Sequence, residues 1–536
     1  MKTIFTITCL LTIFVASAQW TTDTDANTLV AESGELDVLA RGTSDGHTYA
    51  VYWKNVAPPV NIELRLQILD ADGNRLFGND GMLISDQIPM GSFTVSMAAV
   101  VDADDNLYIG VTGTGGGDPA YVFKMDTSGN FLWNTSGVNV GSGHKVTILP
   151  LSGGGAIVGW LSSSGTLMQK YDGSGTAIWA TPMPIAPESG FGAPESFFEL
   201  SNGDIIAVFH KLLSGINSNL YAQRYDTDGN SVWANTVQLS DGLTAFNRNY
   251  SSLQDGNVVY VGYFSAANNR FDSYLQRINP DGTLPWGING ADFDTNQTDY
   301  EMETEIAFQN GSQYVYSIST YRDSNQSERG EYVQKFDKDS GARQFTDNAK
   351  IVFPIGSDKS HAGALRLRNG NPLFLIEAGD ANGASPTTLH SVLLDENGDF
   401  AWPEETRPVA TFAAAKSRVN FTSEGNGQNV AVFVEDKGDG LRIYAQNVED
   451  DTAGVTDFNE LALFFANPVK DEMALRSNSA IQNISVYNVL GQQIFSQEYQ
   501  GDNEIYINTN NWKAGIYFMN ISTEEGLVKG VKLIKR

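Results

Sequence analysis

The chain has 536 residues, of which 34 are basic and 63 acidic, and its formal net charge at pH 7 is −29. A charge of this sign repels nucleic acid and anionic membrane surfaces, so neither is expected as a partner. After the N-terminal segment, no apolar stretch is long enough to cross a membrane as a helix, so no transmembrane segment is expected.

The N-terminus has the pattern of a secretory signal peptide. Lys2 is followed by a short apolar stretch and then by Ala16-Ser17-Ala18, which predicts cleavage before Gln19. We therefore expect residues 1–18 to be removed during export through the inner membrane. Cys9 is the only cysteine and lies in this segment, so disulfide, thiol and cysteine-metal chemistry are excluded from the mature chain.

A repeat dominates the next part of the chain. Seven segments, such as AQRYDTDGNSVW, contain a polar turn, a glycine and an aromatic residue four positions later, and successive glycines lie 46 to 59 residues apart. The glycine allows the positive φ of a tight turn, and the aromatic residue is predicted to pack between neighbouring sheets. The pairs are Gly73 and Phe77, Gly129 and Trp133, Gly175 and Trp179, Gly229 and Trp233, Gly282 and Trp286, Gly341 and Phe345, and Gly398 and Trp402.

A second feature recurs eight times between these turns. It is a short apolar strand, and the eight examples read YAVYW, LYIGV, AIVGW, IIAVF, VVYVGYF, YVYSI, PLFLI and VAVFV. Several short strands per unit, separated by Asp-Gly and Asn-Gly turns, are typical of a β-propeller. The sequence therefore predicts an all-β propeller of eight four-stranded blades over residues 19–455.

The eighth unit predicts how the ring closes. YAQNVEDDT, at residues 444–452, aligns with the start of YAQRYDTDG, but it has Thr452 in place of the glycine and no tryptophan follows. Trp20 lies at a matching distance before the next glycine turn, at Gly46. We therefore expect the N-terminal strand, with Trp20, to complete the last blade and to cover an otherwise open sheet edge.

The repeat resembles the tryptophan-docking motif of eight-bladed quinoprotein-like propellers. This resemblance implies either a quinone-dependent dehydrogenase or a cofactor-free scaffold. The dehydrogenases commonly place a cysteine pair against the quinone, and the mature chain has no cysteine. Departures from the motif include Phe77 and Phe345 at tryptophan positions, Asn279 for the aspartate, and one extra residue before Gly341.

No catalytic motif stands out in the sequence. There is no G-x-S-x-G or H-E-x-x-H, although paired carboxylates for glycoside cleavage stay open because their separation is spatial. No catalytic, cofactor-binding or metal-binding residue is assigned, and no cofactor is expected. The five histidines are expected on strands or at the surface, and they are His47, His144, His210, His361 and His390.

Calcium is an alternative reading of the polar turns. Asp70, Asp72 and Asn74 offer oxygen atoms at alternate positions, as calcium loops do, but the distal glutamate of such loops is missing. The turn interpretation explains all seven segments, so it is preferred.

The pattern changes at residues 456–536, which predict a small immunoglobulin-like β-sandwich of alternating strands. Its motifs resemble the type A C-terminal sorting domain of type IX secretion substrates from Bacteroidota, which implies the type IX secretion machinery as a partner. Physically, Pro468 is expected to start an edge strand, Gly491 and Gly515 to serve turns, and the last strand to expose its basic residues. The matching residues are Asn467, Pro468, Tyr487, Gly491, Gly515, Tyr517, Lys532, Lys535 and Arg536.

Together these features predict a secreted or cell-surface binding or scaffold protein. Its ligand would be an extracellular glycan or protein of unknown identity. The alternative is a secreted hydrolytic or polysaccharide-acting enzyme built on the same propeller.

Overall fold

A computed structural model describes residues 20–33, 36–91, 97–163, 165–185, 192–214, 217–245, 250–267, 270–379, 387–448, 463–465, 467–523 and 528–536. The predicted signal peptide, residues 1–18, lies outside them. The chain divides into two compact units, Met1–Val448 and Glu449–Arg536. All regular structure in the described part is β-strand, which confirms the predicted fold class. No helix in this part is long and apolar enough to cross a membrane.

The described residues of the first unit form eight antiparallel sheets, each with a path of four strands. The innermost strands are β2 (Asp37–Gly42), β6 (Ala98–Val101), β10 (His144–Pro150), β14 (Gly192–Glu199), β19 (Ser251–Asp255), β23 (Tyr300–Ala307), β27 (Lys359–Arg368) and β31 (Lys416–Phe421). The second strands are β3 (Thr48–Asn55), β7 (Leu107–Thr112), β11 (Ala156–Ser162), β15 (Ile205–Ser214), β20 (Val258–Ala267), β24 (Tyr314–Arg322), β28 (Asn371–Ala378) and β32 (Val430–Asp436). These second strands contain the eight predicted apolar strands.

The outer half of each sheet is built in the same way. The third strands are β4 (Ile62–Leu69), β8 (Pro119–Met125), β12 (Gly165–Tyr171), β16 (Asn217–Tyr225), β21 (Arg270–Ile278), β25 (Arg329–Asp337), β29 (Thr387–Leu393) and β33 (Leu441–Asn447). The outermost strands are β5 (Met82–Ser85), β9 (Val138–Ser142), β13 (Met183–Pro184), β17 (Val237–Gln238), β22 (Ala291–Asp292), β26 (Lys350–Phe353), β30 (Arg407–Ala414) and β1 (Thr28–Ala31). A short extra strand, β18 (Thr244–Ala245), also pairs with β16.

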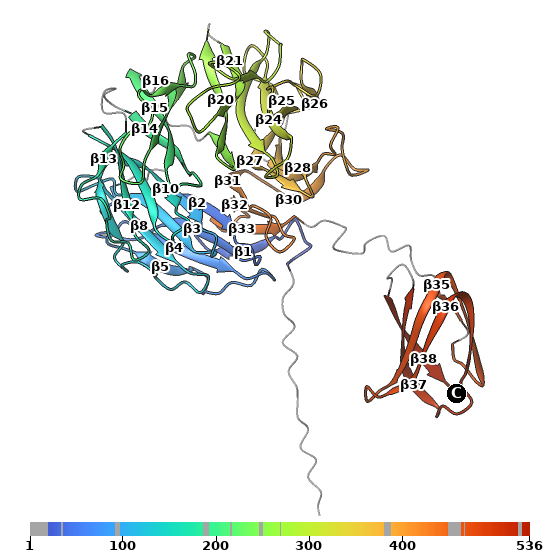
Figure 1. Ribbon diagram of the computed structural model, residues 1–536. Helices are drawn as coiled ribbons and strands as arrows, with labels where there is room; N and C mark the ends of the chain where they lie inside the picture. The colour runs from blue at the N-terminus through green and yellow to red at the C-terminus, as the bar shows by residue number, and fades with distance from the viewer. Residues whose placement is uncertain are drawn as a thin grey trace, which may run out of the picture. The chain divides into compact units, whose positions relative to one another are not determined.

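The eight sheets follow one another around a ring, and each sheet is one blade of the propeller (Figure 1). The innermost strands of most neighbouring blades are in direct contact. Between β14 and β19 the link is a hydrogen bond, in which the Gln254 side chain donates to the Glu199 carbonyl at 2.8 Å. Apolar residues on the faces of adjacent sheets form the hydrophobic clusters between blades, because each sheet buries both faces against its neighbours.

The N-terminal strand closes the ring, as predicted. β1 pairs antiparallel with β33, with Thr28 opposite Ala445 and Leu29 opposite Tyr444. The last blade is therefore assembled from the two ends of the propeller sequence. This pairing satisfies the edge of β33 that would otherwise be exposed.

The second unit is a single five-stranded sheet. It contains β34 (Leu463–Phe464), β35 (Glu472–Asn488), β36 (Gln493–Asn508), β37 (Gly515–Thr523) and β38 (Val528–Lys535). The long pair β35 and β36 has irregular register between Arg476 and Ile481. Met473 and Leu475, before this irregularity, share one core with Ile484 and Val486, after it. The predicted sandwich is thus one sheet whose two halves enclose a common core.

Candidate functional site

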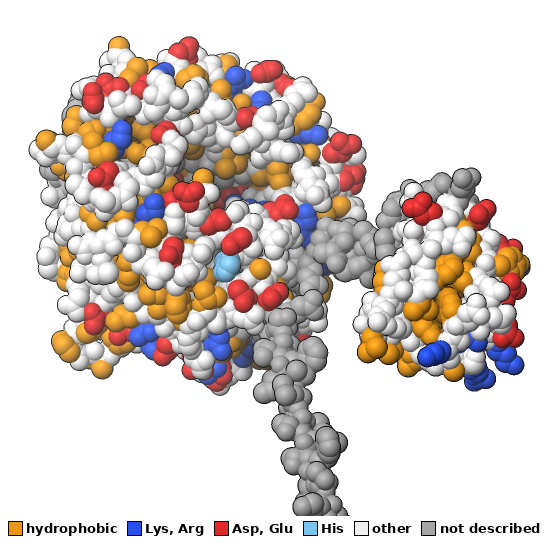
Figure 2. All heavy atoms as spheres, turned by 60° about the horizontal axis from the view of Figure 1, so that its bottom comes forward, with side chains coloured by type: hydrophobic (Ala, Val, Ile, Leu, Met, Phe, Trp, Pro, Cys, Tyr) orange, Lys and Arg blue, Asp and Glu red, His pale blue; other side chains and the backbone are white. Residues whose placement is uncertain are grey.

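A cavity of about 780 Å³ lies among the innermost strands of the propeller. It is lined by residues of β2, β6, β19, β23, β27 and β31, and by the residues just after β23 and β31. Figure 2 shows the surface of the propeller hollowed near its middle. The volume is within the range of small-molecule binding sites. No single blade could form this cavity, because its walls come from six of the eight.

Two arginines line the cavity from the two blades that flank the closing blade, the first and the seventh. Arg41 of β2 donates through Nε to the Ala99 carbonyl at 2.6 Å and through Nη1 to the Ala40 carbonyl at 2.7 Å. Arg366 of β27 donates through Nε and Nη2 to the Phe421 carbonyl at 3.0 and 2.6 Å. Burial and the charge of Arg366 lower the pKa of Arg41 to about 10. Each guanidinium group is thus held by a backbone carbonyl of a neighbouring blade, and Arg41 also by the Ala40 carbonyl of its own strand.

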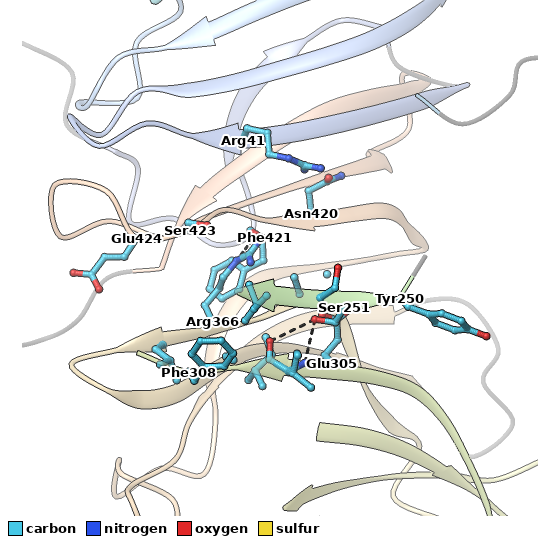
Figure 3. A pocket seen from close by; sticks show the side chains of 18 of the residues that line it. Arg41, Tyr250, Ser251, Glu305, Phe308, Arg366, Asn420, Phe421, Ser423 and Glu424 are labelled. Atoms are coloured by element: carbon cyan, nitrogen blue, oxygen red, sulfur yellow. Dashed lines mark hydrogen bonds between the residues drawn. The ribbon is translucent and has the colours of Figure 1, made fainter. Parts of the chain in front are cut away.

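Glu305 of β23 is the acidic group that faces these arginines (Figure 3). Burial raises its pKa, while the charges of His361 and Arg366 act in the opposite direction. Beside it, Ser251 holds the strand in place, because its hydroxyl accepts a hydrogen bond from the Ile306 amide at 3.1 Å. Phe308 and Phe421 add aromatic surface to the cavity. The cavity therefore combines two cationic groups, partly neutralised by Glu305, with an apolar wall.

A Ser-His-Glu arrangement occurs elsewhere, within the fourth blade. His210 Nδ1 lies 2.9 Å from the Ser218 hydroxyl, and His210 Nε2 lies 3.2 Å from a Glu195 carboxylate oxygen. The His210 side chain has no exposed surface and Glu195 is 3% exposed, so no substrate can reach them. Glu195 also accepts bonds from Lys145 Nζ and the Tyr250 amide. We therefore interpret this group as a link between three blades, since triad distances without access do not give catalysis.

The polar turns bind their own backbone. Asp70 Oδ1 accepts hydrogen bonds from the amides of Asp72 and Asn74 at 3.0 and 2.8 Å, and both carboxylate oxygens contact the Asn74 side chain. Asp226 is bound in the same way by Asp228 and Asn230. In the described residues, no group of three or more His, Cys, Asp or Glu is placed to hold a metal ion. The hydrogen bonds of Asp70 and Asp226 to the backbone of their own turns support the turn interpretation.

The repeat glycines and aromatic residues meet between consecutive blades. The aromatic residue of one blade lies on the turn glycine of the next, so that a Cβ on that glycine would collide with the ring, and every such glycine has a positive φ. The pairs in contact are Trp20 with Gly73, Phe77 with Gly129, Trp133 with Gly175, Trp179 with Gly229, Trp233 with Gly282, Trp286 with Gly341, and Phe345 with Gly398. Trp402 instead stacks on the guanidinium of Arg407, and the turn around Thr452 lies outside the described residues.

Sequence reasoning missed a buried glutamine in the same repeat. In the fourth blade, the Gln223 side chain donates to the Trp233 carbonyl at 3.2 Å and accepts from the Arg224 amide at 2.8 Å. In the last blade, Gln446 donates to the carbonyl of Thr21, next to Trp20, at 2.6 Å. A signal was present, because glutamine recurs six or seven positions before the glycine or its replacement, at Gln67, Gln169, Gln223, Gln276, Gln334 and Gln446.

In the C-terminal unit, the first and last motif residues are joined. The Asn467 side chain donates to the Lys532 carbonyl at 2.8 Å and accepts from the Ile534 amide at 2.9 Å. Val469 then pairs in parallel with Lys535. Pro468, expected to start an edge strand, lies just before this single bridge instead. The Asn467 side chain therefore makes the hydrogen bonds to β38 that a neighbouring strand would otherwise make.

The remaining motif residues partly correct the sequence interpretation. Gly491, with φ +77°, occupies the turn between β35 and β36, as expected. Gly515 does not serve a turn and begins β37. Lys535 is not exposed, because its position alternates inward with Leu533, and its Nζ donates to the Arg536 carbonyl. Of the two motif lysines in the last strand, Lys532 is exposed and Lys535 is buried.

One face of this unit exposes apolar side chains. Ile516 lies opposite Ile534, Phe518 lies opposite Lys532, and Tyr487 lies on the other side of Phe518. Ile516, Phe518 and Ile534 are 40%, 50% and 37% exposed. We call these five residues the outer face. Figure 2 shows apolar side chains on this unit, with basic side chains at one end. Tyr517 belongs to the core instead, and its hydroxyl donates to the Lys513 carbonyl at 2.8 Å.

Comparison with known proteins assigns the C-terminal part. Residues 464–536 match the family described as secretion system C-terminal sorting domain. No curated protein matches the chain.

Solved structures with similarity to the chain include a puromycin hydrolase, with 14% identity and a TM-score of 0.38 over 78% of this chain and 61% of that one. The chain thus spans less than two thirds of that enzyme. Another is the β-propeller domain of the trilobed protease from Pyrococcus furiosus, with 8% identity and a TM-score of 0.39 over 72% of this chain and 98% of that one. By its own sheet topology and by the family match, the chain consists of a β-propeller followed by a type IX secretion sorting domain at residues 464–536.

Proposed function

We propose that this protein is an exported binding protein, whose C-terminal unit directs it through type IX secretion and whose propeller holds a ligand in its central cavity. The cavity carries the binding part of the proposal. It has the volume of a ligand site, and its charged side chains come from separate blades that the closed ring holds in fixed positions.

We further infer that the propeller is of the quinoprotein-like eight-bladed kind and that residues 1–18 are a cleaved signal peptide. The docking of seven aromatic residues, each on the next blade's glycine, supports the first inference. The charged start, apolar stretch and Ala-Ser-Ala of the N-terminus support the second, and a bacterium of the Bacteroidota would be the matching source.

The export part is tested by removing residues 456–536 in a host with type IX secretion. The truncated propeller should accumulate folded in the periplasm, because its ring is complete without this unit. As the matched control, residues 1–18 and 456–536 fused to an unrelated carrier should move that carrier out of the cell. Truncated protein at the parental level outside the cell would contradict the role of the C-terminal unit.

The binding part is tested with the mature full-length protein on arrays of glycans and of extracellular proteins. Saturable binding without release of a product supports the proposal. Product formation from a bound polysaccharide or peptide would overturn it in favour of an enzyme. A complete lack of saturable binding would also count against it.

A further inference from the structure

We propose that the central cavity takes a small organic anion, whose carboxylate or sulfate group is bound between Arg41 and Arg366. This inference rests on the proposed binding function and names the chemical class of its ligand.

The guanidinium groups are held in position before any ligand arrives. Each donates two hydrogen bonds to backbone carbonyls. Arg366 bonds Phe421 of the last blade through two nitrogens, whereas Arg41 bonds Ala99 of the second blade and Ala40 of its own strand. A guanidinium has five N–H groups, so each retains donors for a ligand. Neutral carbonyls orient the groups without cancelling their charge. An anion would therefore find fixed donors and would cost little side-chain entropy on binding.

The charge balance around these arginines is unusual for this chain. The protein carries a net charge of −29, and many of its arginines are paired with carboxylates, as Arg224 is with Asp204 at 2.7 Å. Neither Arg41 nor Arg366 has an ion pair with any residue that the structure describes. Burial and the charge of Arg366 both disfavour the charged form of Arg41. Without a bound anion, the two cations therefore repel each other across the cavity. A bound anion would relieve this repulsion.

The rest of the lining limits the ligand to one compact negative group on a largely uncharged body. Glu305 lies on the wall below Arg366 and would repel a second negative charge (Figure 3). Phe308 and Phe421 offer apolar surface for a ring-sized body. A sugar carrying one carboxylate or one sulfate has these properties. A polyanion would be repelled by the Glu305 carboxylate.

The test is calorimetric titration of the mature full-length protein with glucuronate, glucose 6-sulfate and neutral glucose. We expect binding of one or both anions and at least tenfold weaker binding of glucose, because charge-assisted hydrogen bonds are the strong ones. Preference between the two anions tells a carboxylate ligand from a sulfate ligand. Arg366→Gln should weaken anion binding about tenfold or more, and Arg366→Lys should restore part of it. Glu305→Gln should strengthen it.

Arg442→Gln is the matched control, because Arg442 of β33 pairs with exposed Asp439 in the preceding turn and does not line the cavity. Melting curves identify any variant that fails to fold, and Glu305→Gln then still tests the sign of the charge effect. The inference is overturned if neither anion binds the parent protein, or if folded Arg366→Gln binds as the parent does. A neutral array ligand that binds parent and Arg366→Gln equally would overturn the anion site while leaving the binding function intact.

Discussion

The indole ring of Trp20 lies on Gly73, 53 residues further along the chain, and its Nε1 donates to the Ala71 carbonyl at 2.9 Å. A Cβ on Gly73 would lie 2.8 Å from the ring. In other blades the same contact joins two consecutive turns of the sequence, whereas here it joins the N-terminus of the described chain to the first blade. It therefore locks the last blade, which contains β1, against the first.

Replacing Trp20 with alanine should destabilise the propeller by about 3 to 5 kcal/mol, the cost of emptying a buried aromatic site. Trp20→Phe should cost only about 1 kcal/mol, because Phe77 and Phe345 fill equivalent positions and mainly the Nε1 hydrogen bond is lost. Deleting residues 19–31 should be worse than either, since β1 is lost as well. Urea unfolding of the propeller measures all three. Parental stability of Trp20→Ala would mean that this contact does not hold the ring closed.

Gly73→Ala tests the other side of the same contact. Gly427 is a suitable control because it has a similar positive φ, +73° against +83°, but no atom within 4 Å of an added Cβ. Gly427→Ala should therefore cost only the backbone strain, about 1 to 2 kcal/mol. Gly73→Ala should cost about 1 to 3 kcal/mol more, because Trp20 must move. Equal melting temperatures of the two variants would show that the ring does not press on Gly73.

The pH dependence of stability should report a buried ion pair between the sixth and seventh blades. Burial lowers the pKa of His361, but the nearby charge of Glu331, 3.0 Å away, outweighs burial and raises it from 6.5 to about 9. The folded pKa exceeds the unfolded one, so this stabilisation is fully present below pH 6.5 and is lost as the pH rises through about 9. Its size is about 3 kcal/mol.

Denaturant unfolding from about pH 6 to about pH 10 checks this expectation. The parent should lose stability across the interval, and His361→Gln should start lower and lose less. His390→Gln is the control, because burial lowers the pKa of His390 and its loss should leave the alkaline decline in place. An identical decline in His361→Gln would assign the effect to other groups.

In the C-terminal unit, two substitutions should separate folding from recognition. Asn467→Ala removes both hydrogen bonds to the last strand and should destabilise the unit by about 1 to 3 kcal/mol. Lys532→Gln changes an exposed side chain of the outer face and should leave the stability within about 0.5 kcal/mol. If the secretion machinery binds the outer face, Lys532→Gln should still reduce export. Melting of the isolated C-terminal unit and the exported fraction of the full chain are the two measurements.

Truncating the chain before Val531 would not make this separation. Leu533 is fully buried in the core of the C-terminal unit, so the truncation would damage the fold as well as the charge. Exported Lys532→Gln at the parental level would show that this charge is not part of the recognised surface.

The sequence by itself determined the features that arise from short stretches of chain. A glycine needed for positive φ and an aromatic residue four positions later are set by local turn geometry, so the blades and the role of Trp20 could be read from the repeat. The sorting motif could be read for the same reason. Its last strand was partly misread, because the alternation that buries Lys535 beside exposed Lys532 depends on which face of β38 meets the core.

Only the tertiary structure decided the candidate site. The charged residues of this site lie in three different blades, and no spacing in the sequence links them. They are Arg41, Glu305 and Arg366. Closure of the ring places them around one cavity, where their burial strengthens the electrostatic interactions between them. His210, Ser218 and Glu195, by contrast, are buried within the fourth blade, which packs against the third and fifth blades. Whether a polar group faces a ligand or the interior follows from packing between blades, which acts over distances that local sequence does not encode.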